Sequence, residues 1–215
     1  LGIDHRHVGQ VQDTYTAQAM IMTDLDNNQI TAFHPGAMMH AHQNRIGPDC
    51  KASVGIIAPD GREAMLQHAA QLVAAGVPFV FDPGQGLPMF SGEELACFIG
   101  QASWVTVNDY EGKMLCERTG WSLTDISRKV RGLVVTLGAQ GCEVWVAGEK
   151  THVAPVVPEQ VVDPTGCGDA WRGALLFGLE QGWPLVRCSE LGNRLGALKI
   201  AQRGPQNYTL DFAPV

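Results

Sequence analysis

The sequence lacks the features that mark a secreted, membrane-bound or nucleic-acid-binding protein. Its six cysteines are scattered and contain no C-x-x-C pair, which favours reduced thiols in a cytosolic protein over a disulfide framework. No apolar run approaches the roughly 20 residues of a membrane span, and the first residues show no signal-peptide pattern. With 15 Lys and Arg residues against 22 Asp and Glu residues, the net charge is −7. Neither nucleic acid nor an anionic membrane is therefore an expected partner.

Two widespread nucleotide-binding motifs are also missing. The chain contains no G-x-x-x-x-G-K-[ST] loop, and no G-x-G-x-x-G fingerprint follows a predicted strand. The second absence weighs against a dinucleotide-dependent dehydrogenase. Any nucleotide site must therefore be built from other residues.

Short apolar strands alternate with helices through most of the chain, which predicts an α/β protein whose mostly parallel sheet has helices on both faces. Residues 142–148 and 150–156 are expected to add antiparallel strands. Residues 16–24 and 29–36 are expected to form a β-hairpin that is too small to be a domain alone. The predicted parallel strands are 53–59, 77–84, 103–108 and 132–138, and the predicted helices are 61–76, 91–99, 109–118, 167–182 and 187–202.

Distinctive residues follow three of the predicted strands. Asp82 comes after "VPFVF", Asn108 after "SWVTV" and Gly138 after "LVVTL". Ligands of open parallel sheets gather outside the carboxyl ends of the strands. We therefore expect a functional site at this edge, where the helix that begins after 163–169 could also point.

The stretch "PTGCGDA" (164–170) combines small residues with an acid at the start of a predicted helix. Amides at Gly166, Cys167 and Gly168 could converge on an anion, with help from the helix dipole. The carboxylate of Asp169 could then accept a proton from a hydroxyl group that attacks a phosphate. The alternative is an ordinary Gly-rich turn, because acids are favoured in the first turn of any helix.

Two further motifs fit a phosphate site. In "NDYE" (108–111), Asn108 and Glu111 share one face of a helix start and could bind a hydrated Mg²⁺, although the spacing is also that of a capping box. In "TLGAQG" (136–141), two glycines could let the backbone pass close to a phosphate or ribose. An ordinary hairpin turn is the alternative for this second motif.

Taken together and in this order, the three motifs resemble those of the ribokinase-like, or PfkB, family of sugar and nucleoside kinases. The segment "DPTGCGDAWRGALL" (163–176) is similar to its second signature. The wording "HPGAM" (34–38) most resembles bacterial adenosine-kinase-like nucleoside kinases. The resemblance implies a ribokinase-like α/β domain over 1–215, with 15–36 as part of a β lid. It also implies transfer of the γ-phosphate of ATP to a primary hydroxyl of a nucleoside or sugar.

The resemblance assigns a role to each candidate residue. Asp169 would be the catalytic base that activates the acceptor hydroxyl. The other implied assignments are the amides of Gly166, Cys167 and Gly168 for the anion hole, Asn108 and Glu111 for Mg²⁺ and its waters, Thr136, Gly138, Gly141 and Asn193 for ATP, and Asp163 for a monovalent cation such as K⁺.

The chain also departs from the family pattern. Cys167 stands where the family usually has a smaller residue, and a thiol beside the phosphate path is expected to be sensitive to oxidation. The acceptor-binding Asp and the Gly-Gly…Asn motif of the family are not found. We therefore expect an N-terminally incomplete chain, for which a non-catalytic nucleotide-binding module is the alternative to a kinase.

Three features are left open by the motifs. Arg172 could contact a phosphate or face solvent, since it follows the anion-hole motif by one helical turn. The histidines of "HRH" (5–7) and "HAH" (40–42) are expected to be solvated rather than metal ligands. The lid of the family sometimes forms a dimer interface, so a homodimer through it is a further hypothesis.

Overall fold

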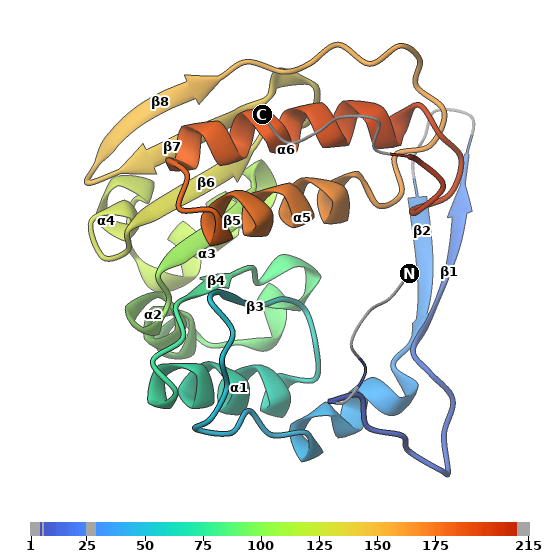
Figure 1. The fold of residues 1–215 in the computed structure, drawn as a ribbon, viewed down its shortest axis with the longest axis vertical. Coiled ribbons are helices and arrows are strands. Elements are labelled where there is room, and N and C mark those ends of the chain that lie inside the picture. The colour runs from blue at the N-terminus through green and yellow to red at the C-terminus, as the bar shows by residue number, and fades with distance from the viewer. Residues whose placement is uncertain (1–4, 6, 25–28, 210–215) are drawn as a thin grey trace.

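The computed structural model describes residues 5, 7–24 and 29–209 and contains a central six-stranded sheet (Figure 1). The strand order is β3-β4-β5-β6-β7-β8. The first four strands are parallel, whereas β7 and β8 are antiparallel to their neighbours. The predicted mostly parallel sheet with an antiparallel addition is thus confirmed. The strands are β3 (Gly55–Ile57), β4 (Phe79–Phe81), β5 (Trp104–Asn108), β6 (Gly132–Thr136), β7 (Cys142–Val146) and β8 (Glu149–Val153).

Helices cover both faces of this sheet. Successive strand residues point to opposite sides, and apolar side chains on both sides need to be buried. Phe79 and Phe81 belong to a core shared with α1 to α4, whereas Val80 packs with α5 and α6. Figure 1 shows α5 and α6 lying side by side across one face. The helices are α1 (Arg62–Ala74), α2 (Gly92–Gln101), α3 (Asp109–Thr119), α4 (Leu123–Ser127), α5 (Cys167–Glu180) and α6 (Leu185–Ile200).

Local sequence signals decide where several helices begin. Ser91, Asn108 and Ser122 each cap a helix through a capping box, in which the cap and an acid three residues later bond to each other's backbone amides. Helices α1, α5 and α6 begin without a side-chain cap, and the N-cap of α5 is Gly166. Among the first amides of α5, that of Gly168 has no acceptor in the described chain and is open to a ligand.

A two-stranded antiparallel ribbon stands apart from the sheet (Figure 1). It consists of β1 (Gln18–Thr23) and β2 (Gln29–His34), with Gln18 opposite His34. This agrees with the predicted hairpin, although residues 25–28 of its turn lie outside the described residues. The ribbon leads into the 3-10 segment η1 (Gly36–Gln43), which packs on α1.

Two further short 3-10 segments lie at the strand ends, namely η2 (Gly84–Met89) after β4 and η3 (Gly138–Gln140) after β6. In the described part of the chain, none of the helices has both the length and the apolar character that crossing a membrane demands.

Candidate active site at the carboxyl edge of the sheet

The carboxyl ends of the parallel strands bring the predicted strand-end residues to one edge. Asn108 at the end of β5 lies directly opposite Thr136 at the end of β6 in the parallel register. Asp82 follows β4, the other neighbour of β5. The residues that follow the three predicted strands therefore lie at the same edge of the sheet, as the sequence predicted.

Helix α5 reaches the same edge through Arg172. Its Nη2 donates to Oδ1 of Asp82 at 2.9 Å, and its Nε donates to Oδ2. Arg172 therefore does not face solvent, and its two paired nitrogens are occupied by a carboxylate of the protein rather than left for a ligand. This fork-to-fork pair fixes the first turns of α5 against the end of β4.

The guanidinium of Arg172 is bonded to Asp82, and the charges of Glu111 and Asp169 also act on it. Asp82 is only 2% exposed, and burial raises its pKa against the opposing effect of Arg172. Burial also raises the pKa of Glu111, against the amide of Asn108 that lowers it, and the charge of Asp82 adds to the rise. A cation close to Glu111 would relieve this unfavourable negative charge.

Asp169 lies exposed in the first turn of α5. Within the described chain its carboxylate has no hydrogen-bond donor or ion-pair partner, because Asp82 takes the guanidinium of Arg172. The carboxylate predicted to act as the base thus lies close enough to Arg172 for its charge to act there, but it is not bonded to the guanidinium.

The amides ahead of Asp169 differ from one another. The N–H of Cys167 donates to the carbonyl of Pro164 at 3.2 Å, whereas those of Gly166 and Gly168 have no acceptor among the described residues. Gly166 has a φ of +82°, and a Cβ there would lie 2.8 Å from Cβ of Pro205. Two of the three predicted anion-hole amides are therefore open. Position 166 requires glycine, because its φ is positive and because a side chain would collide with Pro205.

The thiol of Cys167 is free and partly buried. Burial raises its pKa, and the charge of Lys199 opposes this only in part. Because the thiolate is the reactive form, a raised pKa slows both alkylation and oxidation. The oxidation sensitivity expected from the sequence stays a prediction, and the burial of the thiol acts against it.

Asn108 and Glu111 form the capping box that was the alternative to a metal site. Oδ1 of Asn108 accepts from the Glu111 amide at 2.7 Å, and Oε2 of Glu111 accepts from the Asn108 amide at 2.8 Å. Oε1 of Glu111 accepts no hydrogen bond from any described residue. The cap therefore holds one oxygen of a half-buried carboxylate and leaves the other for a hydrated cation.

The predicted nucleotide loop is the turn of the β6–β7 hairpin. Gly138 has a φ of +56° and Gly141 a φ of +83°. A Cβ on Gly141 would lie only 2.2 Å from the carbonyl oxygen of Val153. The hairpin alternative is thus confirmed as local structure, and the turn packs against the segment that leaves β8.

Asn193 on α6 contacts that same segment. Its Nδ2 donates to the carbonyl of Ala154 at 2.9 Å, and its Oδ1 accepts from the indole of Trp171 at 3.1 Å. The side chain of Asn193 thus ties α5, α6 and residues 153–154 together. Both ends of its amide are already bonded within the protein.

A hollow of about 400 Å³ lies between the segment after β8 and the last turns of α6, and Arg194, the residue after Asn193, contributes to its lining. Apolar side chains that remain partly exposed, Val156, Val157 and Leu198, contribute to it. Its volume is in the range of small-molecule sites. The sequence prediction missed this wall because 150–156 was assigned to a strand, whereas β8 ends at Val153.

Asp163 is held by the backbone rather than exposed to a cation. Its Oδ1 accepts from the Thr165 amide at 2.9 Å and its Oδ2 accepts from the Gly204 amide at 2.8 Å. The Gly204 amide and then the Thr165 amide lower the pKa of Asp163 to about 2. The carboxylate therefore stays ionised and links the start of α5 to the loop after α6.

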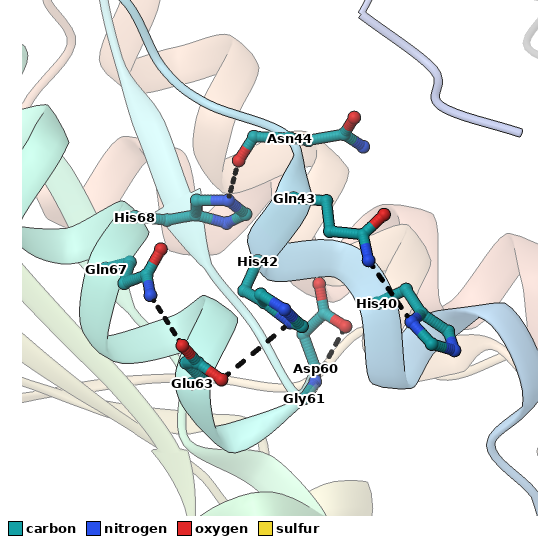
Figure 2. Close-up of polar contacts among 9 residues, drawn as sticks. All are labelled: His40, His42, Gln43, Asn44, Asp60, Gly61, Glu63, Gln67 and His68. Atoms are coloured by element: carbon teal, nitrogen blue, oxygen red, sulfur yellow. Dashed lines mark hydrogen bonds and ion pairs between the residues drawn. The ribbon is translucent and has the colours of Figure 1, made fainter. Parts of the chain in front are cut away.

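The histidines near the η1–α1 contact bind different partners (Figure 2). His68 Nε2 lies 2.9 Å from the carbonyl of Asn44, His42 Nδ1 lies 4.0 Å from a carboxylate oxygen of Glu63, and His40 contacts Gln43. In the part of the chain that the structure describes, no three His, Cys, Asp or Glu side chains gather as metal ligands. Of the "HRH" stretch, residues 5 and 7 are exposed and residue 6 lies outside the described residues.

Comparison with known proteins places this edge in a family context. A family model described as pfkB family carbohydrate kinase matches residues 1–211. A nucleoside kinase from Methanocaldococcus jannaschii is 31% identical over 196 residues, which are 91% of this chain and 64% of that protein. Its structure, an archaeal member of the ribokinase family, matches with a TM-score of 0.85 at 28% identity, over 92% of this chain and 65% of that one.

A nucleoside kinase from Burkholderia thailandensis is similar in structure. Its complex with inosine matches with a TM-score of 0.93 at 49% identity, over 96% of this chain and 68% of that one. Its complex with ADP-inosine matches with a TM-score of 0.91 at 49% identity, over 96% and 65%. These matches confirm the ribokinase-like fold. The chain spans 64% of the length of its Methanocaldococcus relative.

Proposed function

The chain belongs to the pfkB family of carbohydrate kinases, and we propose that the protein is an ATP-dependent kinase that phosphorylates a primary hydroxyl group of a nucleoside. The observation that carries this proposal is the uncapped start of α5, whose open amides precede the unpaired carboxylate of Asp169. The relatives described as nucleoside kinases, one of them with inosine and with ADP-inosine bound, support a nucleoside over a simple sugar.

In the proposed reaction, Asp169 accepts the proton of the acceptor hydroxyl as its oxygen attacks the γ-phosphorus of ATP. An O–P bond forms to the acceptor, and the bond between the γ-phosphorus and the bridging oxygen of ADP breaks. The amides of Gly166 and Gly168, with the dipole of α5 behind them, stabilise the negative charge of the transferring group. Such stabilisation and positioning supply most of the rate in phosphoryl transfer.

Mg²⁺ fits the donor set at the start of α3. The open Oε1 of Glu111 and its raised pKa favour a cation there, with waters completing the shell. When bound, Mg²⁺ supplies charge neutralisation to the β- and γ-phosphates of the nucleotide. Asn108 contributes by holding Glu111 in place through the capping box.

The adenine of ATP is proposed to lie in the hollow between the segment 156–159 and α6. Its apolar side chains offer faces on which a flat base can pack. The glycine turn at 138–141 packs against residues 153–155, which lead into the segment 156–159. In this arrangement, Asn193 shapes the surface from behind through Ala154 and Trp171 rather than bonding to the base.

The ribbon formed by β1 and β2 is proposed as a lid over the acceptor and as a homodimer interface. Met20, Met22 and Ile30 alternate with their neighbours and lie on one exposed face of it. Such a face gains stability when it is covered by substrate or by a second copy. A cytoplasmic location is proposed as well, because all six cysteines are free and ATP is the proposed phosphoryl donor.

Replacing the proposed base tests the function. Asp169→Asn keeps the shape but cannot accept the proton, so we expect turnover to fall by about 10²–10⁴-fold in a phosphoryl-transfer screen of nucleosides and sugars. ATP affinity, measured by calorimetry, should change little. The control is Glu93→Gln, which alters an exposed acid in the first turn of α2. Near-normal turnover of Asp169→Asn would remove the assignment, and nucleotide binding without acceptor binding would favour a non-catalytic module.

A further inference from the structure

We propose that the ammonium group of Lys199 serves as a built-in cation at the start of α5, where the family resemblance places a monovalent ion, so that this protein needs no K⁺. Lys199 would act as a positioning residue for the anion-hole loop, residues 163–168, rather than as a group that touches substrate. The kinetic part of this inference rests on the proposed kinase function, whereas its stability part does not.

Lys199 is fully buried, with 0% of its surface exposed, in the last turn of α6. Its Nζ donates to the carbonyl oxygen of Asp163 at 2.7 Å and to that of Gln202 at 3.0 Å. A buried ammonium is costly unless its hydrogens meet acceptors and its charge is compensated. These carbonyls provide the acceptors, and the ionised carboxylate of Asp163 provides the compensating charge.

The ligands that Lys199 uses are those that a K⁺ ion would take. Backbone carbonyl oxygens replace the hydration shell of K⁺ where proteins bind it. An ion at the carbonyls of Asp163 and Gln202 would lie against the ammonium, and the like charges would repel strongly at that distance. Both carboxylate oxygens of Asp163 are also bonded to backbone amides. The residues present therefore do not fit a K⁺ ion at Asp163.

The same ammonium joins the two chain segments that frame the anion-hole loop. The carbonyl of Ile200 accepts from the amides of Val162 at 2.8 Å and Asp163 at 3.1 Å. The Gly204 amide donates to Asp163 from the other side. Lys199 adds hydrogen bonds to the carbonyls of Asp163 and Gln202, one in each of the two segments. Loss of its charge would loosen the loop that carries the open amides of Gly166 and Gly168.

The charge of Lys199 also acts on Cys167 in the anion-hole loop. Burial raises the pKa of Cys167, and the ammonium of Lys199 is the largest influence that opposes this rise. A fixed positive charge behind the amides adds to the potential that attracts a phosphoryl group. This is the effect that a bound monovalent cation would have at the same place.

The experiment compares KCl with choline chloride at equal ionic strength, using turnover and the midpoint of thermal unfolding. For the unchanged protein we expect both quantities to be insensitive to K⁺, with turnover within about twofold. Lys199→Ala removes the ammonium and leaves room at the carbonyls. In choline its turnover should fall about tenfold or more, and NH₄⁺ or K⁺ should restore much of the loss and raise its unfolding midpoint.

Two further variants separate a cation role from mere packing. Lys199→Met fills the space without a charge, so it should lose activity and gain nothing from NH₄⁺ or K⁺. Lys113→Ala removes an exposed lysine of α3 and should behave like the unchanged protein. If NH₄⁺ or K⁺ restores turnover in Lys199→Ala but not in Lys199→Met, Lys199 acts through its charge. A lysine that only fills space would not give this difference.

The inference fails if K⁺ activates the unchanged protein about tenfold, or if Lys199→Ala is fully active and stable in choline. If neither Lys199 variant folds in any salt, the K⁺ response of the unchanged protein alone decides. If no acceptor is phosphorylated at all, the proposed kinase function fails, while the unfolding midpoints still test whether Lys199 replaces a cation.

Discussion

Removal of Arg172 should show how strongly the buried ion pair holds the active edge together. Arg172→Met keeps most of the side-chain volume but deletes the charge that faces Asp82. Because Asp82 is only 2% exposed, its carboxylate would be left buried without a counter-charge. Breaking a buried pair in this way typically costs about 3–5 kcal/mol. We expect the free energy of unfolding at neutral pH to fall by about that amount.

The pH dependence of this loss has a definite sign. Burial raises the pKa of Asp82 even with Arg172 in place, and the guanidinium lowers it again in part. Without Arg172, the pKa of Asp82 in the folded state rises further above its unfolded value. The folded variant then binds a proton that the unfolded chain releases, so acidification stabilises the variant. The difference in unfolding free energy between the two proteins should therefore narrow as pH falls through the raised pKa of Asp82.

Urea denaturation at several pH values between 5 and 8 tests this reasoning, with two matched comparisons. Arg62→Met breaks an exposed ion pair to Glu94 and should have a much smaller, salt-sensitive effect. The double change Asp82→Asn with Arg172→Met removes both charges and should recover part of the stability. A loss in Arg172→Met that is below about 1 kcal/mol, or that is the same at every pH, would refute the argument.

Two other outcomes follow from the structure. Gly166→Ala places a Cβ at a φ of +82° and in contact with its neighbour in the loop after α6, so stability should fall by about 1–3 kcal/mol and turnover with it. The control is Gly173→Ala in α5, where a Cβ meets open space, and this change should be neutral or slightly stabilising. Equal stability of the Gly166 and Gly173 variants would contradict the requirement for glycine at position 166. If the protein is a dimer through the ribbon, Met22→Lys should convert it to a monomer, as measured by sedimentation velocity. Val73→Lys, at an exposed side chain of α1, should leave the dimer intact. A monomeric unchanged protein would dismiss the ribbon interface.

Local patterns predicted most of the fold because they act over short distances. The alternation of Phe79, Val80 and Phe81 between two cores follows from the pleat of a strand. The capping box of Asn108 and Glu111 needs only residues three apart. These signals are complete within a few residues, so the sequence carried them without knowledge of the tertiary structure.

The parts that the sequence did not predict depend on contacts between distant residues. Asp82 and Arg172 are 90 residues apart, and nothing in either local pattern indicates that they pair. Lys199 occupies a position near a helix end where lysine is normally solvated, yet it is fully buried. The carbonyls that justify its burial come from a loop 36 residues earlier and from the turn after its own helix.

Two cationic side chains, Arg172 and Lys199, hold the start of α5 in place. Arg172 fixes the helix to β4, and Lys199 fixes the preceding loop to the end of α6. Each is hydrogen-bonded to groups other than Asp169, since Asp82 binds the guanidinium and the carbonyls of Asp163 and Gln202 accept from the ammonium. A salt bridge to Asp169 would occupy its carboxylate oxygens. Because both cations are bonded elsewhere, the carboxylate of Asp169 forms no hydrogen bond or ion pair within the described chain, as its proposed role as a base requires.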